Sequence, residues 1–279
     1  MKEIKFDQLP VYSEFPKLYI NNESIEKKFK TTKQVFREFE IEKWGTIHQK
    51  LNNKLIDINN IENEYYNLKN EYVFFENGKF FLDKHLFILN KHILIYEKIL
   101  SKYVKGASAL VEFGSGFGSK IIRLANKKFA KNIPLYAGEL THSGQELIKN
   151  IAGNMNIPIK VGFIDLREKK VSNSFNIPKN AVIFTSYAAH YDPNMDEEFS
   201  NFIAQFKPKA VINFEPCYEF YSSESLHGLM CKKYIEMNDY TTNIWSSISN
   251  FCSRKNLNHK TTKNIIGFNP FMPISIVEW

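Results

Sequence analysis

The second half of the chain alternates short apolar runs with amphipathic segments. The apolar runs cover residues 109–113, 135–140, 159–164, 181–186 and 210–215. Between them, apolar residues at helical spacing predict helices over 119–131, 143–153 and 195–206, the second with a capping box from Ser143 to Glu146. Strands alternating with helices are typical of a doubly wound, mostly parallel α/β sheet. Segments 262–268 and 273–279 can close it as two further strands, which gives a seven-stranded sheet.

The first hundred residues follow a different pattern. Residues 20–70 are polar with apolar positions at helical spacing, which predicts two or three helices; these positions are Ile25, Phe29, Val35, Phe36, Phe39, Leu51, Leu55 and Ile58. Asn77-Gly78 between two aromatic runs predicts a hairpin over 72–82, and a long amphipathic helix follows it. We therefore expect an α/β fold with an N-terminal, mainly helical cap or lid over 1–82. The sheet domain would cover 83–279, with an insertion at about 217–255.

Composition narrows the class of protein. The 279 residues are 43% hydrophobic and 24% charged, as in ordinary globular domains. No apolar run reaches the ~18 residues of a membrane span, and the first residues lack a signal-peptide core, so we expect a cytoplasmic protein with no membrane partner. The three cysteines have no CxxC spacing, and no carboxylate cluster stands out, so neither a disulfide framework nor a metal site is expected.

The formal net charge of +7 raises the question of nucleic acid. However, the basic residues are scattered lysines with few arginines, whereas sequence-specific readers of nucleic acid favour the arginine fork. A nucleic-acid partner is therefore not favoured. A mild positive field also suits a small anionic substrate.

The clearest chemical signal is the segment 110–119, LVEFGSGFGS, in which a strand runs into three glycines and then a helix. Glycines at the carboxyl end of a first strand let the backbone approach a ligand, and open α/β sheets bind cofactors there. The spacing is GxGxG rather than the dinucleotide GxGxxG. With an acid two positions before the first glycine, the chain resembles the class I (Rossmann-like) S-adenosylmethionine-dependent methyltransferases. That resemblance implies S-adenosylmethionine as cofactor, contacted by Glu112, Gly114, Ser115, Gly116, Phe117 and Gly118; the alternatives are a dinucleotide enzyme and a glycine turn without ligand.

The next strands end in further candidate cofactor residues. Glu139 closes the second strand, where a carboxylate can accept both ribose hydroxyls. It could also be a solvated acid at a strand end. By resemblance, Asp165 at the end of the third strand would meet the adenine amino group, although Asp is also a common turn residue. Ser186 and Tyr187, at the end of the fourth strand, complete the predicted cofactor site.

Residues after the fourth and fifth strands are the catalytic candidates. By resemblance, the loop after strand four faces the methyl group and the acceptor, which selects Tyr187, His190 and Tyr191. Histidine is suited to take a proton from an alcohol near neutral pH, and Glu215 could orient His190 or share that task. The rings of Phe117, Tyr187 and Tyr191 could face the sulfonium. The family's Asn/Asp-Pro-Pro-aromatic signature is absent, which argues against DNA-adenine and glutamine-amide methylation.

The long segment after strand five is expected to build the acceptor pocket. Tyr218, Glu219 and His227 are its substrate-binding candidates, and Tyr12 of the N-terminal segment would fold over the acceptor. The alternative is a loop that only covers the sheet edge. His85, His92 and His142 are interpreted as helix or packing residues.

These features predict methyl transfer to a small polar acceptor, anionic or sugar-like, with oxygen favoured over nitrogen. One alternative is a methyltransferase for a peptide or protein side chain. From another class, the fold could serve as a non-catalytic nucleotide-binding or assembly module. A decarboxylated cofactor could also donate an aminopropyl group, which no residue pattern favours. The sequence leaves the acceptor and the oligomeric state open.

Overall fold

The computed structural model describes residues 1–20, 31–51, 57–193 and 195–279. The predicted Ile25, Phe29 and Leu55 lie outside these residues. Five predicted parallel strands form the centre of the sheet: β4 (Leu110–Phe113), β5 (Leu135–Glu139), β6 (Ile159–Asp165), β8 (Val182–Ser186) and β9 (Ala210–Pro216). Helices cover both faces of these strands, which explains why their sequences are continuous apolar runs.

The order of the strands creates a switch point between β4 and β8. Over the described residues the sheet runs β1-β3-β2-β10-β11-β9-β8-β4-β5-β6-β7. From β4 the chain moves outward through β5 and β6, and it then returns to the other side of β4 as β8. Two parallel strands whose connections leave in opposite directions open a crevice at their carboxyl ends, and open α/β sheets bind ligands there.

The sheet is larger than the predicted seven strands, with eleven strands in the described part of the chain. β10 (Lys260–Gly267) and β11 (Ile274–Glu278) form as expected, and β11 pairs antiparallel with β10 on one side and with β9 on the other. The predicted hairpin, β2 (Glu71–Glu76) and β3 (Lys79–Lys84), pairs with β10, and β1 (Lys2–Ile4) extends that edge. The short β7 (Lys170–Val171) pairs with β6 at the other edge. The hairpin covers the backbone groups that β10 would otherwise leave unpaired, a contact between distant segments that sequence periodicity does not report.

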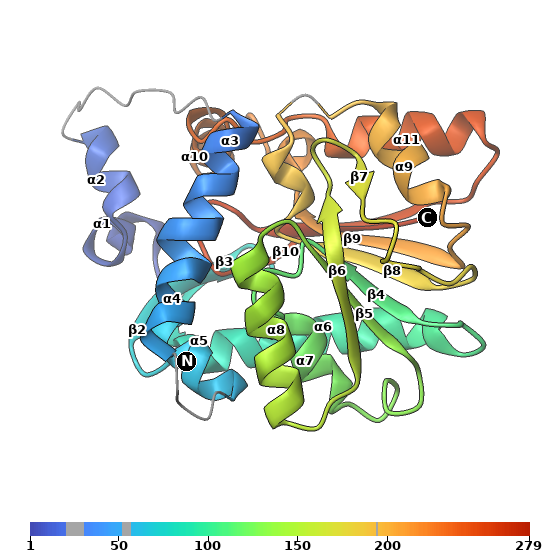
Figure 1. Ribbon diagram of the computed structural model, residues 1–279. Helices are drawn as coiled ribbons and strands as arrows, with labels where there is room; N and C mark the ends of the chain where they lie inside the picture. The colour runs from blue at the N-terminus through green and yellow to red at the C-terminus, as the bar shows by residue number, and fades with distance from the viewer. Residues whose placement is uncertain (21–30, 52–56, 194) are drawn as a thin grey trace.

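Helices pack on both faces of the sheet (Figure 1). The first face carries α6 (His85–Val104), α7 (Ser119–Ala125) and α8 (His142–Asn154); the second carries α9 (Glu197–Ala204) and α11 (Ile244–Arg254). α7 is shorter than the predicted 119–131, because the chain turns from Lys127 onward. α8 is capped by Thr141, whose Oγ1 accepts the Gly144 amide, instead of by the predicted capping box.

The N-terminal region forms helices within the predicted range 20–70, and two short helices that the pattern did not predict precede them. In the described residues these are α1 (Leu9–Tyr12), α2 (Glu14–Ile20), α3 (Thr32–Arg37), α4 (Trp44–Leu51) and α5 (Ile58–Tyr66). A π-helix, η2 (Glu38–Lys43), joins α3 to α4. The insertion forms a 3-10 turn, η4 (Tyr218–Phe220), and α10 (Leu226–Met237) before α11, and another 3-10 turn, η3 (Ala189–Tyr191), follows β8. No described helix has the length and apolar character needed to span a bilayer.

Candidate active site

A cavity of about 390 Å³ lies at the carboxyl ends of the parallel strands, at the switch point of the sheet. Its floor comes from the residues that follow β4, β5, β6 and β8. The helices α3 to α5 with η2 line one wall, and α10, the segment after it and the β10–β11 loop line another. The predicted residues that line it are Gly114, Ser115, Gly116, Phe117, Glu139, Asp165, Ser186, Tyr187, His190 and Tyr191. The fold thus brings together most of the predicted cofactor and catalytic residues.

The glycine loop after β4 fits its surroundings only without side chains. Gly114 and Gly116 have φ angles of 71° and 57°, in the left-handed region. A Cβ on Gly114 would lie 2.4 Å from the Cβ of Ala188, in the loop after β8. A Cβ on Gly116 would lie 3.0 Å from the Trp44 ring. The glycines therefore let β4, the β8 loop and the cap approach one another closely around the cavity.

Glu139 is tied to the glycine loop. Its Oε2 accepts the amide of Gly116 at 2.8 Å, and its Oε1 accepts the amide and the hydroxyl of Thr141. The side chain is 5% exposed, and burial raises the pKa of the Glu139 carboxyl, although these hydrogen bonds oppose the rise. Each carboxylate oxygen can accept more than one hydrogen bond. Glu139 therefore links two loops while keeping acceptor capacity toward the cavity.

Glu112 lies behind the glycine loop and is not among the residues that line the cavity. Its Oε2 accepts the Ile121 amide at 3.1 Å, whereas its Oε1 has no hydrogen-bond partner in the part of the chain that the structure describes. Complete burial raises the pKa of Glu112 to about 8, against the opposing effects of Lys120 and the Ile121 amide. Glu112 thus supports the start of α7 as a largely protonated acid. Gly118, the N-cap of α7, also lies outside the cavity lining.

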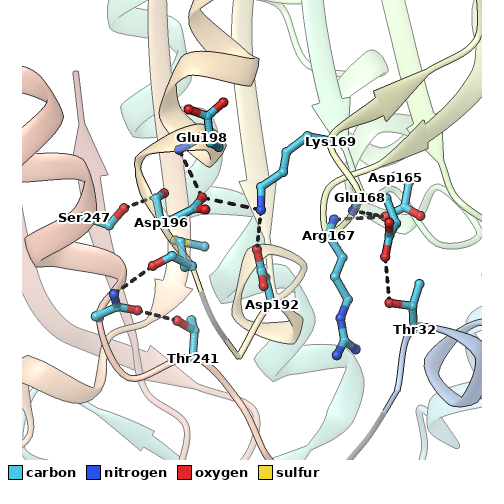
Figure 2. Close-up of polar contacts among 12 residues, drawn as sticks. Thr32, Asp165, Arg167, Glu168, Lys169, Asp192, Asp196, Glu198, Thr241 and Ser247 are labelled. Atoms are coloured by element: carbon cyan, nitrogen blue, oxygen red, sulfur yellow. Dashed lines mark hydrogen bonds and ion pairs between the residues drawn. The ribbon is translucent and has the colours of Figure 1, made fainter.

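Asp165 shapes the loop between β6 and β7. Its Oδ1 accepts the amides of Arg167 and Glu168, each at 2.9 Å. Figure 2 shows this turn beside two further contacts: Glu168 accepts the hydroxyl of Thr32 from the cap, and Lys169 extends to Asp192 in the loop after β8. Asp165 is thus a turn residue, as the alternative interpretation of the sequence stated, and it also lines the cavity.

The loop after β8 begins with a residue in an uncommon conformation. Tyr187 has a φ of 51°, which costs a side chain other than glycine some strain and is often found at functional sites. Its hydroxyl donates to the carbonyl of Met272 at 3.2 Å. Burial raises the pKa of Tyr187 well above its ordinary value, so it keeps its proton. The fold therefore holds this ring rigidly at the cavity wall.

His190, which lines the cavity, forms a buried pair with Glu215, which is not among the lining residues. His190 Nδ1 lies 3.1 Å from Glu215 Oε2, and the side chains are 2% and 0% exposed. Glu215 also accepts the amides of Ala188 and Ala189, so the carboxylate is fixed. The contact at Nδ1 leaves Nε2 as the ring nitrogen that can serve a substrate.

Tyr191, the third catalytic candidate, contacts the rings of His190 at 4.4 Å and Tyr240 at 5.1 Å. Burial, the nearby Tyr240 and a hydrogen bond to it raise the pKa of Tyr191 well above its ordinary value. Tyr191 is therefore better suited to shaping the cavity than to accepting a proton.

Four predicted substrate-binding residues are not brought to the cavity. Tyr218 donates to Glu236 at 2.7 Å, and Glu219 accepts the amides of Trp245 and Ser246 at the start of α11. The remaining two are His227, which packs between aromatic rings with Nε2 2.7 Å from the carbonyl of Pro270, and the partly exposed Tyr12. The insertion still contributes to the cavity, through Tyr234 and Tyr240.

The sequence did not predict the residues that line two walls of the cavity. The cap contributes Thr32, Val35, Phe39, Lys43, Trp44, Tyr65 and Tyr66, and the C-terminal half contributes Tyr234, Tyr240, Phe268, Asn269 and Met272. The position of the β10–β11 turn follows from the pairing of the strands. Because β11 runs antiparallel to β9, the turn that precedes β11 must lie at the carboxyl end of β9, next to the cavity. The residues of the cap carry no comparable signal, because only tertiary packing places them.

The histidines of α6 pack as predicted. His92 is fully buried and stacks on Phe268 with ring centroids 3.8 Å apart, and His85 stacks on Phe268 and Tyr66. Burial lowers the pKa of His85 to about 4 and that of His92 well below its ordinary value, so both are neutral. Next to them, Tyr96 contacts the cavity residue Ser186 at 2.8 Å. In the described ranges no three His, Cys, Asp or Glu residues gather in a metal-binding arrangement.

Comparison with known proteins gives matches only among solved structures. No family model and no curated protein matches the chain. The structure of PigF with SAH is 12% identical and covers 95% of this chain and 84% of PigF, with a TM-score of 0.43. MtNAS in complex with MTA and tNA is 11% identical over 88% of this chain and 71% of MtNAS, with a TM-score of 0.46. The mitomycin 7-O-methyltransferase MmcR is 14% identical over 66% of this chain and 53% of MmcR, with a TM-score of 0.43.

Proposed function

We propose that this protein is an S-adenosylmethionine-dependent methyltransferase that acts on a small molecule. One observation carries the proposal. The glycine loop after β4 and the acid at the end of β5 are joined by the hydrogen bond from the Gly116 amide to Glu139, at the switch point where such sheets bind ligands. Glu139 lines the same cavity as Gly114 and Gly116. A site for a nucleoside requires this arrangement, because the ribose hydroxyls need an acceptor beside the glycine loop.

The residues present fit the cofactor. The glycine loop offers a backbone surface without side chains, Glu139 has acceptor capacity for ribose hydroxyls, and Asp165 lies at the end of the next strand for the adenine. Ser186 and Tyr187 line the cavity from the end of β8, on the other side of the switch point. When bound, S-adenosylmethionine supplies an activated methyl group on a sulfonium. The role of the protein is then to align the acceptor and to exclude water.

His190 is the residue we assign to proton removal from the acceptor. If Nδ1 donates to Glu215, Nε2 is left to accept the proton, and a carboxylate in this position stabilises the imidazolium that forms. The two backbone amides at Glu215 keep the carboxylate in place while the histidine changes charge. This pair favours a hydroxyl acceptor, which has to lose its proton near the transition state. A non-catalytic nucleotide-binding module would have no use for it.

The cavity lining refines the expected acceptor. Ten aromatic side chains line it: Phe39, Trp44, Tyr65, Tyr66, Phe117, Tyr187, Tyr191, Tyr234, Tyr240 and Phe268. Several phenol groups already bond within the protein, such as Tyr187 to Met272 and Tyr191 to Tyr240. A sugar needs a partner for each hydroxyl, since unpaired polar groups are costly to bury. The lining thus favours a hydroxylated acceptor with a flat apolar ring over the sugar-like one, and Lys120 offers a charge for an anionic group.

A methyltransferase for peptide side chains is the competing candidate. It needs a groove that admits an extended chain, whereas the cap helices line one side of the cavity and α10 with the segment after it lines another. Turnover with small phenols but not with peptides of mixed sequence is the outcome we expect from a screen for methyl transfer. The opposite preference would select the competing candidate.

Titration calorimetry with S-adenosylhomocysteine tests the cofactor site. We expect micromolar binding, about 8 kcal/mol, to the wild-type protein. Glu139→Ala should weaken it by about 1.5 to 3 kcal/mol, the scale of hydrogen bonds to a charged group. Glu146→Ala is the matched control, because this acid pairs with Lys149 on the outer surface of α8. Unchanged affinity in Glu139→Ala would remove Glu139 from the site, and preferential binding of a nicotinamide dinucleotide would overturn the proposed function.

A further inference from the structure

The cap contains a π-helical turn directly beside the cavity. η2 interrupts the helical segment that runs from α3 to α4, and the Trp44 amide donates to the carbonyl of Phe39, five residues earlier. Such turns are rare and are frequently found at functional sites. Phe39, Lys43 and Trp44 line the cavity from this turn. The rare geometry thus coincides with the part of the cap that faces the proposed cofactor site.

Gly45 makes this turn compatible with the helix that follows. A Cβ at this position would lie 2.2 Å from the carbonyl oxygen of Glu40, a distance that real side chains do not show. Because the obstructing atom belongs to the backbone, no side-chain rotation could relieve the contact. An alanine would therefore force the π turn to rearrange, and with it the direction of Trp44.

The turn is docked on both loops that would hold the cofactor. Glu40 accepts the Ser143 hydroxyl with its backbone carbonyl at 3.1 Å and the Ser143 amide with its carboxylate, just after the β5 loop. Trp44 is 6% exposed and covers Gly116, and its ring lies 5.2 Å from that of Phe117. The turn therefore spans from α8 to the glycine loop, across the position of Glu139.

From this arrangement we infer that Trp44 is a further cofactor-contacting residue, held over the glycine loop by a latch formed by residues 38–44. Gly45 and Ser143 are positioning residues for the latch. This inference rests on the proposed function. Because the latch covers the loop that the cofactor has to reach, it must open for the cofactor to enter or leave. Binding and latch closure therefore stabilise each other.

Dissociation of S-adenosylhomocysteine, measured by surface plasmon resonance on the full chain, tests the latch. Gly45→Ala should release the ligand at least tenfold faster than the wild type. The matched control is Gly153→Ala, another helical glycine, whose added Cβ would meet no atom within 4 Å and should leave the rate unchanged. Trp44→Ala should accelerate release similarly, and Trp44→Phe, which keeps a ring over Gly116, should recover much of the loss.

Hydrogen exchange separates the latch from a merely structural role. Ligand binding should raise the protection of residues 32–51 in the wild type and in Gly153→Ala, but much less in Gly45→Ala. If Gly45→Ala does not fold, Ser143→Ala and Trp44→Ala carry the test, because neither adds an atom. Wild-type release rates in all latch variants would overturn the inference alone. Absence of ligand binding to the wild-type protein would overturn the proposed function together with it.

Discussion

Replacing the buried acid of the first motif should make the protein less sensitive to alkaline pH. Glu112 is fully buried, and only one of its oxygens has a partner in the described structure, the Ile121 amide. Burial raises its pKa from 4.5 to about 8. In Glu112→Gln the amide oxygen can still accept from Ile121, while the group can no longer ionise.

The sign of the effect follows from the two pKa values. Folding favours the protonated carboxyl, so the contribution of Glu112 to stability is complete below about pH 4.5 and is lost as the pH rises to about 8. The difference corresponds to about 5 kcal/mol in total, of which on the order of 3 kcal/mol is lost between pH 5 and pH 8. Any cost of fitting the amide into the site is independent of pH and cancels in this comparison.

Urea denaturation of both proteins at pH 5 and pH 8 measures this change. We expect the free energy of unfolding of Glu112→Gln, relative to the wild type, to rise by about 3 kcal/mol between the two pH values. Glu146→Gln serves as control, because a hydrogen bond to Lys149 lowers the pKa of that acid and the effect should have the opposite sign. A relative stability that does not change with pH would show that Glu112 is ionised in the folded protein.

Three further predictions concern the catalytic pair, the cap and the N-terminal segment. Once an acceptor is found, His190→Ala should lower turnover about 10²- to 10⁴-fold, with partial recovery at high pH and unchanged affinity for S-adenosylhomocysteine. A small loss of turnover with an unaltered pH–rate profile would exclude His190 as the base. Glu62→Ala should destabilise the fold by about 3 kcal/mol in urea denaturation, because it leaves the largely buried Arg123 without its carboxylate, whereas the exposed Glu64→Ala should change stability by less than about 1 kcal/mol. Deleting residues 1–20 removes β1 and Phe15, which packs on the cavity residue Tyr234. The deletion should lower turnover in a steady-state assay but leave cofactor affinity nearly intact, and full activity of the truncated protein would make the segment a scaffold only.

The central sheet could be predicted because its signals are local. Each parallel strand is a continuous apolar run, and the position of Gly114 and Glu139 at the ends of neighbouring strands follows from the order of elements alone. The sequence predicted that Glu215 would either orient His190 or share its task. His190 follows β8 and Glu215 lies near the end of the neighbouring β9, but the sequence does not define the direction of either side chain.

The enclosure of the cavity could not be predicted, because it depends on contacts between distant segments. Trp44 reaches Gly116 across more than sixty residues, through a π turn that no hydrophobic periodicity announces. Glu219 looked like a substrate ligand because it follows a buried strand, yet it satisfies the first amides of α11. The sequence shows the acid but not which unpaired backbone amides lie near it.

A crystal structure of the protein with S-adenosylhomocysteine tests the proposed function most directly. We expect the nucleoside in the cavity, with both ribose hydroxyls within hydrogen-bonding distance of Glu139 and the sulfur directed toward His190. The unfilled part of the cavity, lined by Tyr191 and Tyr240, would then give the shape of the acceptor. A ligand bound away from the glycine loop, or one whose ribose does not contact Glu139, would refute the proposed cofactor site.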